Sequence, residues 1–172
     1  MSDTSGVETT GEHYELPPPH PELRRLDPLV GNWRGAGRST DNFGPEMDIE
    51  GTERFWWLKG GYFLASEYRM SWGGSQPPDE GVMYWGYDAE LGRLKTYFFN
   101  DKGPFDSELS SYEGVVEHSQ LTFTGPARFC FRLDDVGQVA VDKDGRIHTE
   151  WFLRDADGEF KLWRYHDYTP LS

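Results

Sequence analysis

The chain has few of the residues and segments that cross-link, anchor or export other proteins. Its 172 residues include one cysteine, Cys130, which excludes an internal disulfide and a zinc site built from several cysteines. Because Cys130 lies between Phe129 and Phe131, we expect a buried structural thiol rather than a nucleophile. No apolar run approaches the length of a membrane span, and the N-terminus lacks the basic and apolar regions of a signal peptide. These absences predict a cytoplasmic protein with no membrane segment.

Basic residues are also scarce. The chain has 17 basic against 30 acidic residues, which gives a formal net charge of −13. Repulsion from phosphate groups opposes binding to nucleic acids and to anionic membranes, so we expect neither as a partner. A charge of this sign is more simply explained by solubility through self-repulsion.

Aromatic side chains are abundant by comparison. They make up 16% of the residues while the whole hydrophobic fraction is 36%, so the interior must be built from rings more than from leucine and isoleucine. Aromatic residues favour β-strand formation, and the 20 glycines and 11 prolines disfavour long helices. The composition therefore predicts an all-β protein, and the length fits one domain.

The order of segments predicts a barrel. Residues 1–20, which include Pro17-Pro18-Pro19, are expected to form a disordered proline-rich arm, and residues 21–172 a single domain. A short amphipathic helix from Pro21 is expected to cover one end of that domain. About ten alternating strands follow, joined mostly by hairpin-type turns. We therefore predict an antiparallel up-and-down barrel of about ten strands.

The first strand has an unusual face. In the stretch Leu29–Ser39, the residues Gly31, Trp33, Gly35 and Gly37 alternate and so share one side of a strand. Glycine on one strand face indicates a close backbone approach or a sharp bend. We expect the Trp33 ring to close one end of the barrel while the glycines let the strand curl, which is a structural role.

The motifs that follow this strand carry a family resemblance. They are, in order, Gly51-Thr52-Glu53, Trp57-Leu58-Lys59-Gly60-Gly61-Tyr62-Phe63-Leu64, Gly86-Tyr87-Asp88 and Tyr97-Phe98-Phe99-Asn100. With the first strand, they resemble an uncharacterised bacterial family of lipocalin-like, calycin-type β-barrels related in shape to nitrobindin. The resemblance covers about residues 21–168. It implies a barrel with a cavity, and no particular reaction, because barrels of this shape bind different ligands and some catalyse reactions.

Our leading hypothesis is a binding protein rather than an enzyme. Several strands carry rings on both faces, as Tyr84 and Trp85 do, which suits a barrel wide enough to hold a ligand. The cavity, of roughly 300 Å³ or more, would enclose a small hydrophobic or aromatic molecule, with no cofactor. Glu67, Arg69 or His166 would orient a polar end of that molecule. The full set of cavity candidates is Trp33, Phe55, Trp57, Phe63, Glu67, Arg69, Tyr84, Trp85, Tyr97, Glu150, Trp163 and His166.

Haem binding is the first alternative. The resemblance to nitrobindin-shaped barrels implies haem b held by a histidine late in the chain, here His166 or His148. The segment around the nitrobindin ligand is not reproduced here, which favours a structural histidine. No pair of histidines has metal-ligand spacing, so no other metal site is expected.

Two further alternatives belong to other functional classes. A barrel enzyme acting on a hydrophobic metabolite would use Glu67 or Glu150 as its acid–base, and requires an inward carboxylate with a raised pKa. No serine-hydrolase elbow, phosphate loop or dinucleotide fingerprint is present, so no catalytic residue is assigned. An interaction module would instead use outward rings to form a homodimer.

Overall fold

The computed structural model describes residues 16–40, 44–73, 77–101 and 111–171. Most of the predicted disordered arm, residues 1–20, lies outside these ranges. No helix in the described ranges is long and apolar enough to cross a membrane.

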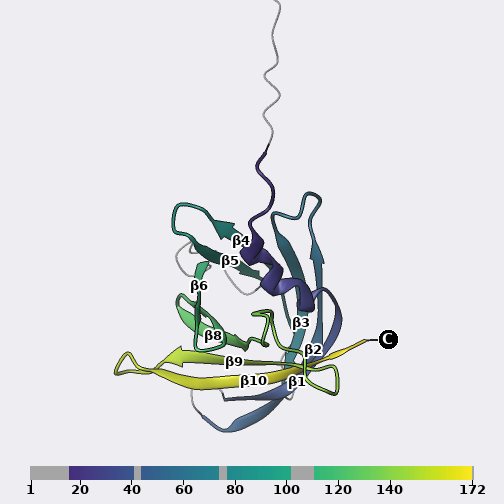
Figure 1. Ribbon diagram of the computed structural model, residues 1–172. Helices are drawn as coiled ribbons and strands as arrows, with labels where there is room; N and C mark the ends of the chain where they lie inside the picture. Colours follow the sequence, from purple (N-terminus) through teal and green to yellow (C-terminus); the bar gives the residue numbers. More distant parts are fainter. Residues whose placement is uncertain (1–15, 41–43, 74–76, 102–110, 172) are drawn as a thin grey trace, which may run out of the picture.

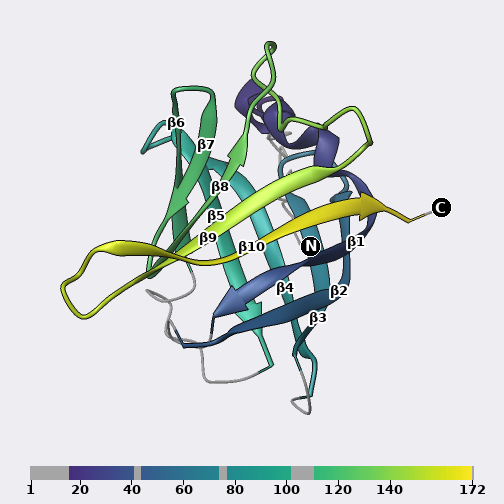
Figure 2. The ribbon, with the colours of Figure 1, turned by 90° about the horizontal axis from the view of Figure 1, so that it is seen from below.

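Ten antiparallel strands close into one barrel (Figure 1). Each strand pairs with its neighbours in the sequence, and the last strand closes the barrel against the first, as the turned view in Figure 2 shows. This confirms the predicted fold class. The elements are the 3-10 helix η1 (Pro21–Leu29) and strands β1 (Gly31–Thr40), β2 (Glu46–Trp57), β3 (Leu64–Trp72), β4 (Asp79–Asp88), β5 (Arg93–Asn100), β6 (Ser111–Glu117), β7 (Gln120–Thr124), β8 (Ala127–Arg132), β9 (Ile147–Arg154) and β10 (Phe160–Pro170).

Alternation along each strand decides which side chains fill the interior. On β2, Ile49, Glu53 and Phe55 are buried, whereas Glu50 and Arg54 are exposed. The neighbouring strands follow the same period of two, so one inward row from each strand meets inside the barrel.

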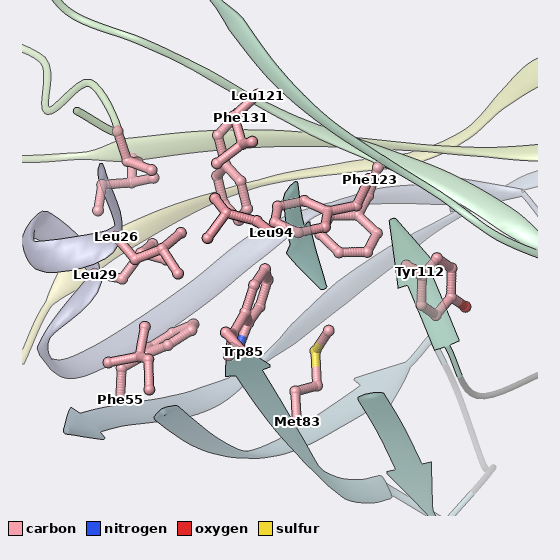
Figure 3. Close-up of a cluster of buried hydrophobic side chains, with 14 of the residues drawn as sticks. Leu26, Leu29, Phe55, Met83, Trp85, Leu94, Tyr112, Leu121, Phe123 and Phe131 are labelled. Carbon is pink, nitrogen blue, oxygen red and sulfur yellow. The ribbon is translucent and has the colours of Figure 1, made fainter. Parts of the chain in front are cut away.

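Helix η1 closes one mouth of the barrel with leucines. Leu26 and Leu29 are fully buried, and Figure 3 shows them in one cluster with Phe55 and Trp85. The Trp85 ring lies 5.1 to 6.1 Å, centroid to centroid, from three phenylalanine rings on β7 and β8, which are Phe123, Phe129 and Phe131. Burial of closely packed apolar side chains such as these is the main source of folding stability in a small barrel.

The glycine–tryptophan face of β1 performs the expected structural role. The Trp33 indole donates a hydrogen bond to the Leu29 carbonyl at 2.6 Å, which ties β1 to the end of η1. A Cβ at Gly35 would lie 2.9 Å from Met70 Cε and 3.5 Å from the Tyr168 ring. A Cβ at Gly37 would lie 2.6 Å from the His166 Cα. The two glycines therefore leave room for the inward side of β10.

Candidate functional site

The interior changes character with distance from η1. Along β1 away from the helix, Gly35, Gly37 and Ser39 pair in turn with Tyr168, His166 and Arg164 of β10. Polar groups thus gather toward the mouth opposite η1. We call this set the polar half: Glu53, Tyr68, Arg164, His166 and Tyr168.

These five residues line a small enclosed space. Its volume is about 30 Å³, and its remaining lining is largely apolar, including Met70, Phe98 and Trp151. A space of this size holds on the order of two water molecules. It is therefore far smaller than the cavity of roughly 300 Å³ that we expected from the sequence.

A bulge in β10 turns Arg164 inward. Leu162 pairs with Phe152 of β9, whereas Arg164 pairs with the next residue of β9, Trp151, so Trp163 is an extra residue in the ladder. Without this extra residue, Trp163 would stand opposite Trp151 on the inner face. After the bulge, Arg164, His166 and Tyr168 share the inner face at spacings of two.

Arg164 is a half-buried cation among aromatic rings. Its guanidinium carbon lies 4.0 Å from the ring centroid of Trp151, 4.6 Å from that of Trp163 and 4.9 Å from that of Trp72. Its Nε is buried without a hydrogen-bond partner, and no carboxylate of the described ranges forms an ion pair with the guanidinium. Aromatic faces attract a guanidinium but supply no counter-charge, so this cation lacks an anion.

Glu53 is a buried carboxyl group that faces the same space. It is 6% exposed, and the Tyr168 hydroxyl donates a hydrogen bond to its Oε2 at 2.5 Å. Burial raises the pKa of Glu53 to about 7, although the Tyr168 hydrogen bond and the positive charge of Arg164 both oppose this rise. Glu53 therefore changes its protonation state near neutral pH.

His166 is buried with both ring nitrogens free. It is 3% exposed, its ring meets Tyr168 edge-on at 4.6 Å, and neither nitrogen has a hydrogen-bond partner within the described ranges. Burial, followed by the charge of Arg164, holds its pKa well below the usual value, so the ring is neutral at physiological pH. Buried polar atoms nearly always have partners, so water or a ligand is expected at these nitrogens.

Comparison with known proteins assigns a family. One family model, described as "Protein of unknown function (DUF1579)", matches residues 18–163. The chain belongs to the DUF1579 family. Its fold is similar to the crystal structure of Rv2717c from M. tuberculosis, with a TM-score of 0.60 and 13% sequence identity over 90% of this chain and 99% of that chain. No curated protein sequence matches the chain. The lipocalin-like barrel shape is thus supported, and the relation to nitrobindin stays a prediction.

Six of the twelve predicted cavity residues of this DUF1579 chain lie inside the barrel or at its ends. Phe55, Trp85 and His166 line the enclosed space. Trp33 lies at the η1 end. Half-buried Trp57 also lies there, and its indole donates to Asp27 Oδ1 at 2.9 Å. Half-buried Trp163 stacks on the Trp72 ring at 5.6 Å, beside Arg164.

The other six lie on the outer face, so their predicted inward placement is wrong. On β3 the inward row is Leu64, Ser66, Tyr68 and Met70, which turns Glu67 and Arg69 outward. These two form exposed ion pairs, Glu67 with Arg54 at 3.9 Å and Arg69 with Glu80 at 3.1 Å. The same alternation turns Tyr84 and Tyr97 outward, while exposed Phe63 covers Gly86 and Glu150 lies half-buried beside Cys130.

The alternation of inward and outward side chains also decides where the two candidate haem ligands, His148 and His166, point. His148 lies on the outer face, where its Nδ1 is 2.7 Å from Asp167 Oδ1. His166 does face inward, but the adjoining space of about 30 Å³ has no room for a porphyrin. Within the described ranges, no group of three His, Cys, Asp or Glu side chains is arranged to hold a metal ion. The residues present therefore do not fit haem.

Sequence reasoning missed most of the polar half. Glu53 was not among the predicted cavity residues, but it shares a strand face with Phe55 and Trp57, which were. This alternation is the sequence signal that could have found it. Arg164, His166 and Tyr168 also alternate, but of these three only His166 was a candidate. Tyr68 carried no signal beyond its place in the inward row of β3.

Proposed function

We propose that this DUF1579 barrel binds a small organic acid in its polar half, with the carboxylate of the ligand against Arg164. The apolar part of the ligand would lie against Met70, Phe98 and Trp151. This keeps the partly hydrophobic ligand expected from the sequence, reduces it to a few carbon atoms and gives it an acidic end.

The observation that carries the proposal is the unpaired guanidinium of Arg164. Taking a charge out of water costs several kcal/mol unless an opposite charge and hydrogen bonds compensate. Three tryptophan rings surround Arg164, yet no described carboxylate pairs with it. A bound carboxylate would supply both the charge and a flat pair of acceptors that suits a guanidinium. The free nitrogens of His166 lie on the same wall and offer a further polar contact.

Formate, acetate and propionate, each compared with its neutral amide, test this proposal. The readout is the indole resonance of Trp151 in a ¹⁵N–¹H NMR titration at pH 6.5, with outward-facing Trp56 as internal reference. We expect at least one carboxylate to shift the Trp151 resonance saturably and its amide to leave it unchanged. Equal binding of the acid and the amide would contradict the proposal.

A matched pair of arginine variants locates the site. Arg164→Met should weaken carboxylate binding roughly 10- to 100-fold, because it removes a charge-assisted hydrogen bond. Arg69→Met removes a guanidinium from the outer face, where its side chain is 65% exposed, and should leave the affinity unchanged. Circular dichroism checks that both variants fold. An Arg164→Met variant that folds and binds as tightly as the wild type would place the anion elsewhere.

Catalysis by acid–base chemistry is the second candidate, and one observation favours it. Glu53 is the inward carboxyl group with a raised pKa that an enzyme of this kind requires, in place of Glu67 and Glu150. Such a group can take a proton from carbon next to a carbonyl. Pyruvate in D₂O tests this: the protein should accelerate loss of the methyl proton signal, and Glu53→Gln should abolish that acceleration.

A further inference from the structure

We propose that each carboxylate bound in the polar half enters together with one proton, and that Glu53 accepts this proton. The inference rests on the proposed function and adds the form of the ligand, which is a weak acid bound as anion plus proton. The proton comes from solvent, no bond of the ligand is broken, and the bound state holds a neutral Glu53 carboxyl group beside the carboxylate that pairs with Arg164.

Placement of the two charged groups is the first argument. Glu53 on β2 and Arg164 on β10 line the same enclosed space, yet they form no ion pair with each other. That space is about 30 Å³, so an anion that contacts Arg164 from inside it also lies beside Glu53. Two carboxylates in contact in a buried site cannot both stay ionised.

The surroundings of Glu53 leave no other group to neutralise the second negative charge. From β10 it meets Tyr168, His166 and Arg164; from β3, Ser66 and Tyr68. The charge of Asp79 on β4 acts on Tyr68, and β1 presents Trp33 and Gly35. Arg164 is the one cation among these described residues, and the carboxylate of the bound ligand would already neutralise its charge.

The hydrogen bonds of Glu53 indicate where the proton would reside. Tyr168 already donates to Oε2, so Oε1 is the oxygen left to carry a proton and donate it to the ligand. His166 is the competing acceptor. Burial and the charge of Arg164 both disfavour its protonation, whereas the Glu53 carboxyl group already gains protons near pH 7.

The consequence is a defined dependence of affinity on pH. When binding requires protonated Glu53, affinity is constant below the pKa of the free protein, about 7, and falls as pH rises above it. The expected loss is about tenfold between pH 6 and pH 8. Propionate itself stays ionised throughout this range, so the change belongs to the protein.

The experiment measures propionate binding and proton uptake together. The dissociation constant is determined by NMR at pH 6 and pH 8, and proton uptake at pH 8 is measured in a pH-stat as protein is saturated. Wild-type protein should take up close to one proton per propionate and bind about tenfold more weakly at pH 8. Glu53→Gln keeps an acceptor for Tyr168 but cannot ionise, so it should take up no proton and bind equally at both pH values. Glu67→Gln, on the outer face, should behave as the wild type.

Each outcome separates this inference from the proposed function. Propionate binding without proton uptake, and with equal affinity at both pH values, overturns the inference and leaves the proposed function standing. Proton uptake that persists in Glu53→Gln overturns it too, and points to His166. No binding of formate, acetate or propionate by the wild type at pH 6 overturns both. Should Glu53→Gln not fold, the ¹³C carboxyl titration of Glu53 in wild-type protein decides, because saturating propionate should move its midpoint upward.

Discussion

The barrel has two halves that follow the same strand alternation and differ in what they bury. Under η1, the inward side chains are hydrocarbon and rings, such as Leu26, Phe55 and Trp85. Farther from η1 the same rows continue into Glu53, which pairs with Trp33, and then into half-buried Arg164 near the opposite mouth. Withdrawing either charge from water costs free energy. Stability therefore comes mainly from the half under η1, which we call the apolar half. The polar half retains groups that folding alone would not select, and such groups concentrate at binding and catalytic sites.

Removal of Trp85 is expected to have the largest effect. Its side chain is 2% exposed and meets the rings of β7 and β8, so Trp85→Ala should lower the free energy of unfolding by about 3–5 kcal/mol. Urea denaturation measures this loss. The control is Trp56→Ala, which truncates a half-buried outward ring on β2 and should cost less than half as much. Equal losses would mean that the apolar half does not dominate stability.

Closure by η1 is tested by Leu26→Ala. Leu26 is fully buried between the helix and the barrel, and this truncation should cost about 2–5 kcal/mol through lost burial and a cavity. Leu91→Ala, in the turn between β4 and β5, removes the same atoms from a side chain that is 44% exposed and should change stability by less than about 0.5 kcal/mol. A small loss at Leu26 would show that η1 only rests on the barrel.

The architecture of both halves was predictable because its signals are local. The alternation of Gly31, Trp33, Gly35 and Gly37 predicted a curled first strand, and the close approach of β10 to Gly37 is its physical reason. Hairpin-type turns between alternating segments predicted an all-antiparallel barrel, and η1 begins at Pro21 as expected. Period and turn chemistry depend on neighbours in sequence, so one chain suffices to interpret them.

The lining of the polar half was not predictable in the same way. Tyr84 and Trp85 are both rings, so composition alone does not tell which one faces inward, and only strand pairing decides it. On β10 the extra residue Trp163 shifts the alternation, which brings Arg164 rather than Trp163 to the inner face. Glu53 follows the inward period but has the chemistry of a surface residue. Such a group is recognised as internal only when its neighbours in space are known.

The cost of keeping Glu53 in the polar half is measurable through pH. Burial raises its pKa from 4.5 to about 7, so the unfolded chain loses its proton at lower pH than the folded protein does. Stability is therefore full below pH 4.5, and is lost as pH rises toward 7. Glu53→Gln should remove this slope and, relative to the wild type, gain about 2–3 kcal/mol between pH 5 and pH 8. Urea denaturation at both pH values tests it, with Glu67→Gln as the control that should gain nothing.

The outer face should show the smallest effect, although it carries charges of the same kinds as the interior. Arg69 and Glu80 are 3.1 Å apart on β3 and β4, with side chains 65% and 56% exposed. Water and salt screen such a pair, so a double-mutant cycle with Arg69→Met and Glu80→Gln should give a coupling of less than about 1 kcal/mol that declines as sodium chloride is raised. A coupling of several kcal/mol, insensitive to salt, would mean that something covers this face in solution. The contrast between half-buried Arg164, for which we propose an anion ligand, and exposed Arg69, which only pairs weakly, would then no longer hold.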